Sequence, residues 1–313
     1  MDYIDEKKIE NSLKYDSLIP AIQEGFNAHI KVPMRHHHDY YNPVENNDST
    51  LLIMPAWNPG DSLGIKCVTV SPNNSKYELP AINGIYILYD AVKGVPRALL
   101  DAKSLTRIRT AATSALASTF LSRKDAKTLL VIGTGALAPE LIKAHCTVRN
   151  FEEVYIWGRN PEKASKVAKA LESEFDINVA TDLNECVAQS DVISCATLSE
   201  TPLIEGKYLK SGSHVDLVGA YRKDMREADD DVISRSRLFV DSIETAPKET
   251  GDLVIPIQKG LIDLSDIKAD LFELCAGRKP GRSTDEEITC FKSVGHALED
   301  LVAAQMVLKE LNR

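Results

Sequence analysis

The chain has 313 residues and a formal net charge of −9, with 43% hydrophobic and 27% charged residues. These values are typical of a globular protein of about two domains, and the acidic balance disfavours nonspecific nucleic-acid binding, which needs clustered Lys and Arg. No apolar run approaches the roughly 20 residues that span a bilayer, and the N-terminus lacks the apolar core of a signal peptide, so we expect a cytoplasmic protein.

The first hundred residues predict a helix followed by antiparallel strands. Asp16 or Ser17 can cap a helix that carries Ile22 and Phe26 on one face. Residues 49–101 contain several strand-like segments divided by turn residues, which is typical of an antiparallel sheet.

Three consecutive histidines, residues 36–38, invite a metal-site interpretation. Adjacent residues of a strand point to opposite faces, so the three rings cannot converge on one ion, and we expect no metal. The six cysteines are scattered, without CxxC or metal-binding spacing, which favours free thiols.

Lys66 stands in an alternating segment, GIKCVTV, on the same side as Val68 and Val70. A lysine among apolar neighbours is either an edge residue whose ammonium reaches water or a partly buried cation that meets an anionic ligand. Both interpretations remain open from the sequence.

A helix of small residues follows, for which Ser104 is the predicted N-cap. Almost every residue between Arg109 and Ser118 is small, so this helix can approach another backbone or a cofactor closely. Arg109 is then either a ligand-binding cation or an exposed arginine on a close-packed helix. The predicted apolar stripe consists of Leu105, Ile108, Ala112, Ala115 and Leu116.

Residues 128–145, TLLVIGTGALAPELIKAH, predict a buried strand, a glycine turn and a helix. Gly133, Gly135 and Ala138 give the GxGxxA form of the dinucleotide fingerprint, in which the helix start binds a pyrophosphate. An ordinary strand-to-helix turn is the alternative, but a second strand, residues 154–159, completes a βαβ unit.

The end of that second strand should face the adenosine ribose. The chain places Arg159, Asn160 and Lys163 there, without the carboxylate typical of an NAD site. Such side chains can hold a 2′-phosphate, so we expect NADPH, with NADH as the alternative cofactor. Otherwise Arg159 and Lys163 are solvated residues of a helix start.

The rest of the chain predicts an α/β doubly wound sheet of the Rossmann type. Residues 191–197 and 236–242 predict further strands, and the first of these ends in small residues. Residues 214–227 contain another strand, with Gly219 and Ala220 at its C-terminal end. Residues 284–311 predict a strand and then a long C-terminal helix, whose apolar face needs a partner in the first domain.

Together, motifs along nearly the whole chain resemble the ornithine cyclodeaminase/mu-crystallin family. They are PMR, MPAW before GIKCVTV, LTRIRTAATSALAS, VIGTGALA, IWGRNPEKA, LVGAYRKDMREAD and EITCFKSVG. The resemblance implies an α+β substrate-binding and dimerisation domain built from both chain ends, residues 1–120 and 289–313. It also implies a dinucleotide-binding Rossmann domain, residues 121–288, and a homodimer.

The resemblance also implies roles for individual residues. Arg35, Lys66 and Arg109 match positions that bind the substrate carboxylate, with Lys66 and Arg109 expected in catalysis and Asn83 added as a strand residue facing the same cleft. Two guanidinium groups and an ammonium can fix a planar carboxylate. The cofactor is expected to contact the following positions, besides the fingerprint glycines and the ribose-facing residues: Thr110, Ala136, Thr197, Leu198, Val218, Gly219 and Ser293.

Tyr221 is the informative departure from the cyclodeaminases, which place an acid there to handle the amine of ornithine. The chain is instead similar to the ketimine-reducing branch, which implies NAD(P)H-dependent reduction of 1-pyrroline-2-carboxylate to L-proline or of 1-piperideine-2-carboxylate to L-pipecolate. The alternatives are an alanine dehydrogenase, a cyclodeaminase, and a protein that binds NADPH and a small ligand without turnover.

Overall fold

The computed structural model describes residues 2–312, which form two compact units. Unit 1 comprises the described residues up to Arg109 and from His296 onward, and unit 2 comprises Thr110–Gly295. The sequence placed these divisions after residues 120 and 288. Every helix within residues 2–312 is too short or too polar to cross a bilayer.

Unit 1 is built on a six-stranded sheet of order β1-β6-β5-β4-β3-β2. β1 runs parallel to β6, and the other neighbours are antiparallel, so the predicted antiparallel sheet is confirmed. The strands are β1 (Asp2–Ile4), β2 (His36–Asn42), β3 (Asn47–Asn58), β4 (Ser62–Val70), β5 (Ile82–Asp90) and β6 (Pro96–Asp101), with a 3-10 turn, η1 (Pro72–Tyr77), before β5.

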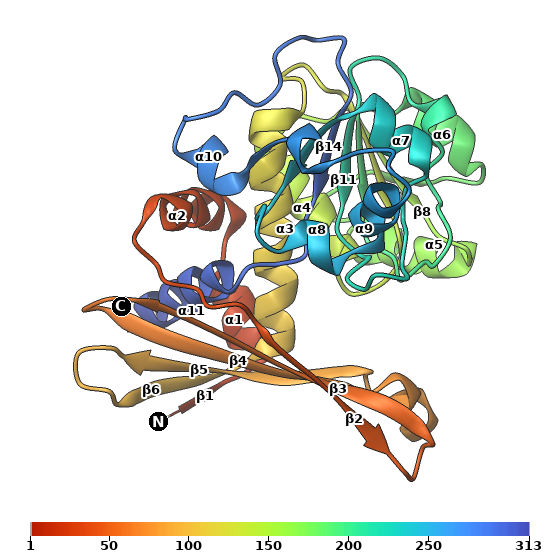
Figure 1. Cartoon of the computed structure of the whole chain (residues 1–313). Helices are drawn as coiled ribbons and strands as arrows, with labels where there is room; N and C mark the ends of the chain where they lie inside the picture. The colour runs from red at the N-terminus through yellow and green to blue at the C-terminus, as the bar shows by residue number, and fades with distance from the viewer. Residues whose placement is uncertain (1, 313) are drawn as a thin grey trace. The chain divides into compact units, whose positions relative to one another are not determined.

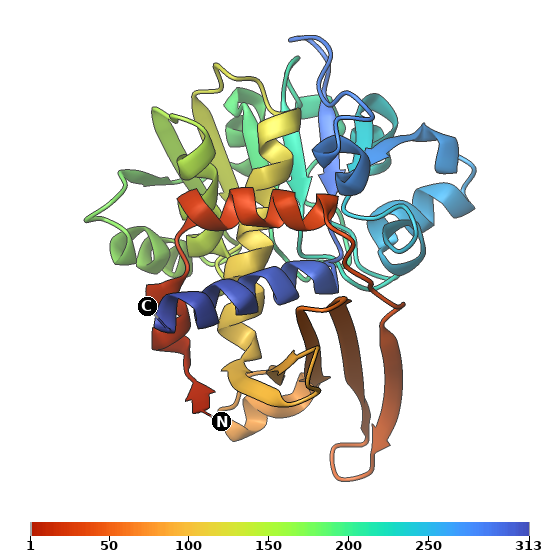
Figure 2. The ribbon, with the colours of Figure 1, turned by 90° about the vertical axis from the view of Figure 1, so that its left-hand side faces the viewer.

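Helices α1 (Glu6–Ser12), α2 (Tyr15–Asn27) and α11 (Ala297–Leu311) complete unit 1. α11 packs against α2, β3 and β4, so the C-terminal helix does return to the first part of the chain as predicted. Figures 1 and 2 show α2 and α11 side by side. The predicted cap of α2 is wrong, because Lys14 holds the N-cap position and makes no side-chain bond there.

Helix α3 (Ala102–Leu121) starts two residues before the predicted cap. The carboxylate of Asp101 accepts hydrogen bonds from the Ser104 backbone N and Oγ, both at 2.7 Å. Asp101 therefore caps the helix, and Ser104 does not. The predicted apolar stripe of α3 is buried throughout.

Unit 2 is built on an eight-stranded parallel sheet of order β13-β12-β14-β11-β10-β7-β8-β9. The order reverses at β7, because β8 and β9 follow on one side of it and β10 and β11 on the other. This confirms the Rossmann-type doubly wound sheet. The strands are β7 (Thr128–Ile132), β8 (Glu153–Trp157), β9 (Ile177–Val179), β10 (Val192–Cys195), β11 (His214–Leu217), β12 (Arg237–Val240), β13 (Ile267–Asp270) and β14 (Thr289–Lys292).

Helices lie on both faces of this sheet (Figure 1). On one face, α3 and α4 reach Asp216 of β11 through Ser114 Oγ, at 3.1 Å, and His145 Nε2, at 3.4 Å. On the other face, α6, α7 and α9 pack residues such as Val187 and Leu253 into one apolar core. The helices are α4 (Ala138–Val148), α5 (Pro161–Ala170), α6 (Leu183–Gln189), α7 (Asp230–Arg235), α8 (Ala246–Glu249), α9 (Gly251–Gln258) and α10 (Leu271–Cys275), with 3-10 turns η2 (Gly206–Tyr208) and η3 (Leu264–Asp266).

Candidate functional site

A buried cluster of charges lies in unit 1. Lys66 and Arg109 are each 3% exposed. Lys66 Nζ lies 2.7 Å from Asp300 Oδ2, and Arg109 Nε donates to Asp300 Oδ1 at 2.8 Å. Arg109 Nη1 also donates to the Glu299 carboxylate. The structure thus brings together the two cations singled out from the sequence and joins them through one carboxylate.

The local sequence explains why these side chains point inward. In β4, Gly64, Lys66 and Val68 are buried while the residues between them are half-buried, so the predicted alternation is confirmed. Arg109 follows Ile108 on the buried side of α3. The alternatives of an edge lysine and an exposed arginine are therefore wrong.

The charges of this cluster shift one another's titration. Burial, then the nearby Arg109, lowers the pKa of Lys66 to about 8, while Asp300 opposes the change. Burial alone would lower the pKa of Arg109, but Asp300 and Glu299 together outweigh it and raise that pKa. Burial would raise the pKa of Asp300, but Arg109 and Lys66 lower it. Among Lys66, Arg109 and Asp300, Lys66 is therefore the group whose pKa lies nearest to neutral pH.

Arg35 and Asn83 were also predicted at this cluster. Arg35 is half-buried just before β2, and its charge contributes to lowering the pKa of Lys66. Asn83 pairs with Thr69 in the β4–β5 register, whereas Lys66 pairs with Tyr86 three residues away. That odd spacing places Asn83 on the opposite face of the sheet, where its Nδ2 donates to the Pro80 carbonyl at 2.9 Å. In a single chain, Asn83 and Lys66 therefore lie on opposite faces of the sheet, so the prediction that they face the same cleft is wrong.

Glu299 and Asp300 were not predicted from the sequence. Both are fully buried in the first turn of α11, and the Glu299 Oε1 atom also accepts a hydrogen bond from His296 N, which caps that helix. The signal in the sequence that could have revealed them is a pair of adjacent acids between apolar residues of one helix. Charges that are fully buried are normally paired, which points to a cationic partner elsewhere in the chain.

The predicted pyrophosphate turn follows β7 in unit 2. Gly133 has φ +124°, a conformation that other residues rarely adopt, and a Cβ there would lie 2.6 Å from the Ala196 carbonyl oxygen. Ala138 is buried at the start of α4, while Gly135 and Ala136 are exposed. A Cβ at Gly135 would meet nothing within 4 Å, so this backbone is open on the side where a phosphate would approach. The turn therefore fits a dinucleotide.

The residues after β8 lie on the surface. Arg159, Asn160 and Lys163 are exposed. The Asn160 side-chain oxygen accepts hydrogen bonds from Glu162 N at 2.9 Å and Lys163 N at 3.2 Å, so it caps α5. The two cationic side chains remain the groups able to hold a 2′-phosphate.

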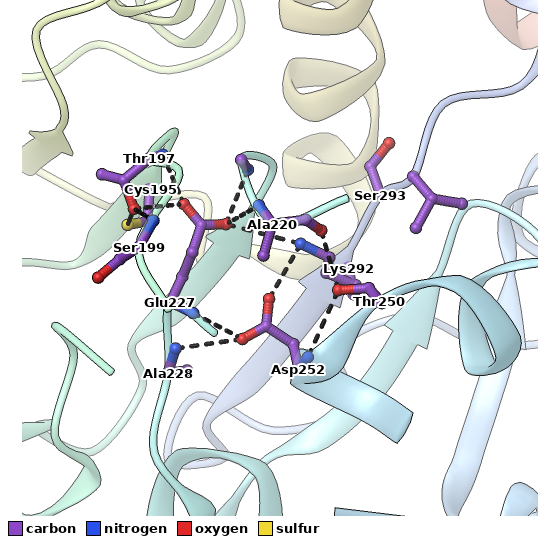
Figure 3. A network of polar contacts seen from close by, with 12 residues as sticks. Cys195, Thr197, Ser199, Ala220, Glu227, Ala228, Thr250, Asp252, Lys292 and Ser293 are labelled. Atoms are coloured by element: carbon purple, nitrogen blue, oxygen red, sulfur yellow. Dashed lines mark hydrogen bonds and ion pairs between the residues drawn. The ribbon is translucent and has the colours of Figure 1, made fainter. Parts of the chain in front are cut away.

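The ends of β10 and β11 are joined by one buried carboxylate (Figure 3). Glu227 Oε1 accepts a hydrogen bond from Thr197 N at 2.7 Å. Glu227 Oε2 accepts hydrogen bonds from Gly219 N at 2.7 Å and Ala220 N at 3.1 Å. A Cβ at Gly219 would lie 2.1 Å from the backbone N and O of Thr197, so only glycine allows this approach. Two predicted cofactor positions, Thr197 and Gly219, thus lie together.

Two more charged groups lie against Glu227. Lys292 Nζ is 3.0 Å from Asp252 Oδ2 and 3.6 Å from Glu227 Oε2, and all three side chains are buried. Burial raises the pKa of Glu227, although Lys292 opposes it. Burial alone would lower the pKa of Lys292, but Asp252 and Glu227 outweigh it and raise that pKa.

The remaining predicted cofactor positions occupy separate settings in unit 2. Ser293 follows β14, and its Oγ donates to Asp241 Oδ2 at 3.1 Å. Val218 is half-buried after β11, and Leu198 is 64% exposed after β10. Thr110 is half-buried in α3. All except Thr110 follow the carboxyl ends of parallel strands, where doubly wound sheets bind ligands.

The three histidines lie on β2 and are exposed. The rings of His36 and His38 share one side, with centroids 6.0 Å apart, while His37 Nε2 contacts Asp39 Oδ1 at 3.0 Å. Within residues 2–312, no group of three or more His, Cys, Asp or Glu side chains is arranged to hold a metal ion. All six cysteines are free thiols.

Residues 2–313 match the sequence profile of the ornithine cyclodeaminase/mu-crystallin family. The chain belongs to this family. The similarity therefore extends across both units, as the motifs in the sequence implied.

Individual relatives cover nearly the whole chain. A Delta(1)-pyrroline-2-carboxylate reductase from Colwellia psychrerythraea is 37% identical over 315 residues, which cover 99% of each protein. A Thermococcus litoralis Delta(1)-pyrroline-2-carboxylate reductase, solved in complex with NADH and L-proline, superimposes with a TM-score of 0.94 at 33% identity, covering 100% of this chain and 98% of that one. An archaeal alanine dehydrogenase dimer with bound NAD has a TM-score of 0.91 at 27% identity, covering 99% and 95%.

Proposed function

We propose that this protein is an NAD(P)H-dependent reductase that converts 1-pyrroline-2-carboxylate into L-proline, and 1-piperideine-2-carboxylate into L-pipecolate. The full-length similarity to the Thermococcus litoralis reductase, with its NADH and L-proline, carries this proposal. The buried pair of Lys66 and Arg109 supports it, because the substrate presents a carboxylate beside its C=N bond.

The roles of the unit 1 residues follow from their charges. Arg35, Lys66 and Arg109 hold the substrate carboxylate and fix the orientation of the ring. The reaction adds a hydride to the imine carbon and a proton to the ring nitrogen, and the reduced nicotinamide supplies the hydride when bound. With its pKa lowered to about 8, Lys66 carries a proton at neutral pH and is the candidate donor as well as a carboxylate ligand.

The cofactor-binding residues belong to unit 2. The open turn at Gly133, Gly135 and Ala136 would hold the pyrophosphate. Arg159 and Lys163, exposed after β8, would hold a 2′-phosphate, so NADPH is preferred and NADH is the second cofactor. Comparing kcat/KM for the two cofactors tests this preference, and a higher value for NADH would refute it.

A homodimer in the cytoplasm is part of the same proposal. The face of the unit 1 sheet opposite its helices carries half-buried apolar side chains, including Ile53, Trp57, Ile65 and Ile87. A second copy of the chain would cover this face, as isologous dimers do. Light scattering of the wild type should give twice the mass of one chain, and Ile65→Lys should give the mass of a single chain. A monomeric wild type would refute the dimer.

The decisive assay follows NADPH absorbance with three sets of substrates. We expect NADPH to be oxidised with 1-pyrroline-2-carboxylate and to change little with pyruvate plus ammonia. Ornithine should cause little reduction of NAD. Arg109→Ala should abolish turnover while NADPH still binds, and Arg109→Lys serves as the second variant if the alanine variant does not fold. If no imine causes NADPH to be oxidised, a protein that binds a ligand without turnover is favoured.

Alanine dehydrogenase is the second candidate, favoured by the archaeal dimer with a TM-score of 0.91. Faster NADH oxidation with pyruvate and ammonia than with either cyclic imine would establish it. A cyclodeaminase ranks lower because Tyr221 stands where those enzymes place an acid.

A further inference from the structure

The carboxylate of Glu227 lies between the backbone segments that follow β10 and β11 (Figure 3). We call Thr197, Gly219 and Ala220 the rim. One oxygen of Glu227 accepts from Thr197 and the other accepts from Gly219 and Ala220, so a single side chain satisfies three backbone N–H groups in the two segments that follow these strands. Buried N–H groups need such acceptors.

The position of the rim in the sheet indicates which part of a dinucleotide it would meet. The strand order reverses at β7, with β8 and β9 on one side and β10 and β11 on the other. In doubly wound sheets, each half of a dinucleotide binds over one side of this switch point. The first βαβ unit takes the adenosine half, so the rim beyond β10 and β11 lies on the nicotinamide side.

A second layer of charges holds Glu227 in place. Asp252 Oδ1 accepts hydrogen bonds from Glu227 N at 2.8 Å and Ala228 N at 3.2 Å, and Lys292 lies between the two carboxylates. Thr250 Oγ1 donates to the Ala220 carbonyl at 2.9 Å. The rim is therefore held by a connected buried network, in which loss of one member leaves others without partners.

We propose that Glu227, held by Lys292 and Asp252, is a positioning residue that fixes the rim against which the nicotinamide half of the dinucleotide binds. This inference rests on the proposed function only in requiring a nicotinamide dinucleotide as ligand. Glu227 acts through the backbone of Thr197 and Gly219.

Glu227→Gln is the direct test, because glutamine keeps the shape but offers one acceptor oxygen in place of two. Either Thr197 N or the Gly219 and Ala220 N–H groups then lose their acceptor. We expect NADPH to bind at least about tenfold more weakly, as for buried donors left unsatisfied. The ligand 2′,5′-ADP, which carries only the adenosine half, should bind as it does to the wild type. Hydrogen exchange at the rim amides should become faster.

The chain offers a matched control, Asp191→Asn. Asp191 is a buried carboxylate that accepts hydrogen bonds from Lys127 N at 2.7 Å and Thr128 N at 3.1 Å, and it pairs with Arg123 at 3.0 Å. It lies at the opposite, amino-terminal ends of β7 and β10. Asp191→Asn should lower the Tm about as much as Glu227→Gln does. It should not weaken the binding of NADPH relative to that of 2′,5′-ADP. If Glu227→Gln does not fold, Glu227→Asp, which is too short to reach both segments, should show the same selective loss.

The selective loss of NADPH supports the proposal. Equal weakening of NADPH and 2′,5′-ADP, unchanged NADPH binding, unchanged exchange at the rim amides, or a wild type that binds no dinucleotide overturns it. A wild type that reduces 1-pyrroline-2-carboxylate while Glu227→Gln binds NADPH normally would refute this inference alone. The reverse case, selective loss without imine turnover by the wild type, would refute the proposed function alone.

Discussion

Asp300→Asn tests whether the bridging carboxylate keeps Lys66 protonated. Asp300 lies 2.7 Å from Lys66 Nζ and accepts from Arg109 Nε at 2.8 Å, in a site where all three side chains are buried. Asparagine keeps the size of the side chain but removes the charge. Burial and Arg109 then act on Lys66 without the opposing effect of Asp300, so the pKa of Lys66 falls below its present value of about 8.

The size of the change follows from Coulomb's law. Unit charges 4 Å apart in an effective dielectric of about 20 interact by about 4 kcal/mol, and one pKa unit corresponds to about 1.4 kcal/mol. Allowing for solvent that replaces part of the lost interaction, we expect the pKa of Lys66 to fall by about two units. In the proposed mechanism the protonated form binds the substrate carboxylate, so the alkaline decline of kcat/KM should move from about pH 8 to about pH 6.

The assay is the pH profile of kcat/KM with 1-pyrroline-2-carboxylate for the wild type, Asp300→Asn and Glu299→Gln. Titration of the imine itself is common to all three. Glu299 contacts Arg109, so Glu299→Gln should lower activity without moving the alkaline decline. Binding of pyrrole-2-carboxylate, a planar acid with no imine bond to reduce, should show the same shift by calorimetry. If the alkaline declines of the wild type and Asp300→Asn coincide, Asp300 does not set the protonation of Lys66.

Three further predictions concern unit 2. Arg159→Ala should raise the KM for NADPH about tenfold or more and leave that for NADH unchanged, since the arginine would bind the 2′-phosphate; equal changes would show that it does not. Gly219→Ala should lower the Tm and weaken NADPH, because its Cβ would lie 2.1 Å from Thr197 backbone atoms; a normal Tm in a calorimetric scan would contradict this. Burial lowers the pKa of His214 to about 3, so below pH 6.5 the unfolded chain binds a proton that the folded chain does not, and stability should fall by about 1.4 kcal/mol per pH unit as pH decreases toward 3. His214→Gln should flatten that dependence in urea unfolding measured at several pH values, and an unchanged slope would count against it.

The fold was predictable wherever a local pattern repeats. Alternation in β4 fixed the direction of Lys66, and the glycine turn after β7 fixed the start of the parallel sheet, because both depend on neighbours a few residues away. The caps of α2 and α3 were not predictable in the same way. Several residues before each helix can cap it, and packing selects among them.

The charged partners were the part that the sequence could not supply. Lys66 and Asp300 are separated by 234 positions, the difference between their numbers, and no local pattern pairs them. Glu227 likewise belongs to a polar segment, MREAD, whose ordinary interpretation is a solvated turn. Pairing over such separations is a property of the tertiary fold. Predicting Lys66 and Arg109 as site residues, in contrast, required only a resemblance to family motifs.

The two carboxylates that neutralise Lys66 and Arg109 are carried by α11, which follows unit 2 in the sequence. A ribosome therefore releases the cations of unit 1, and then all of unit 2, before their counter-charges emerge. Until that helix emerges, Lys66 and Arg109 lack the carboxylates of Glu299 and Asp300, and burying the two cations without them is costly. Chains stopped before residue 296 should accordingly contain a protease-resistant parallel sheet beside an N-terminal segment that proteases still digest.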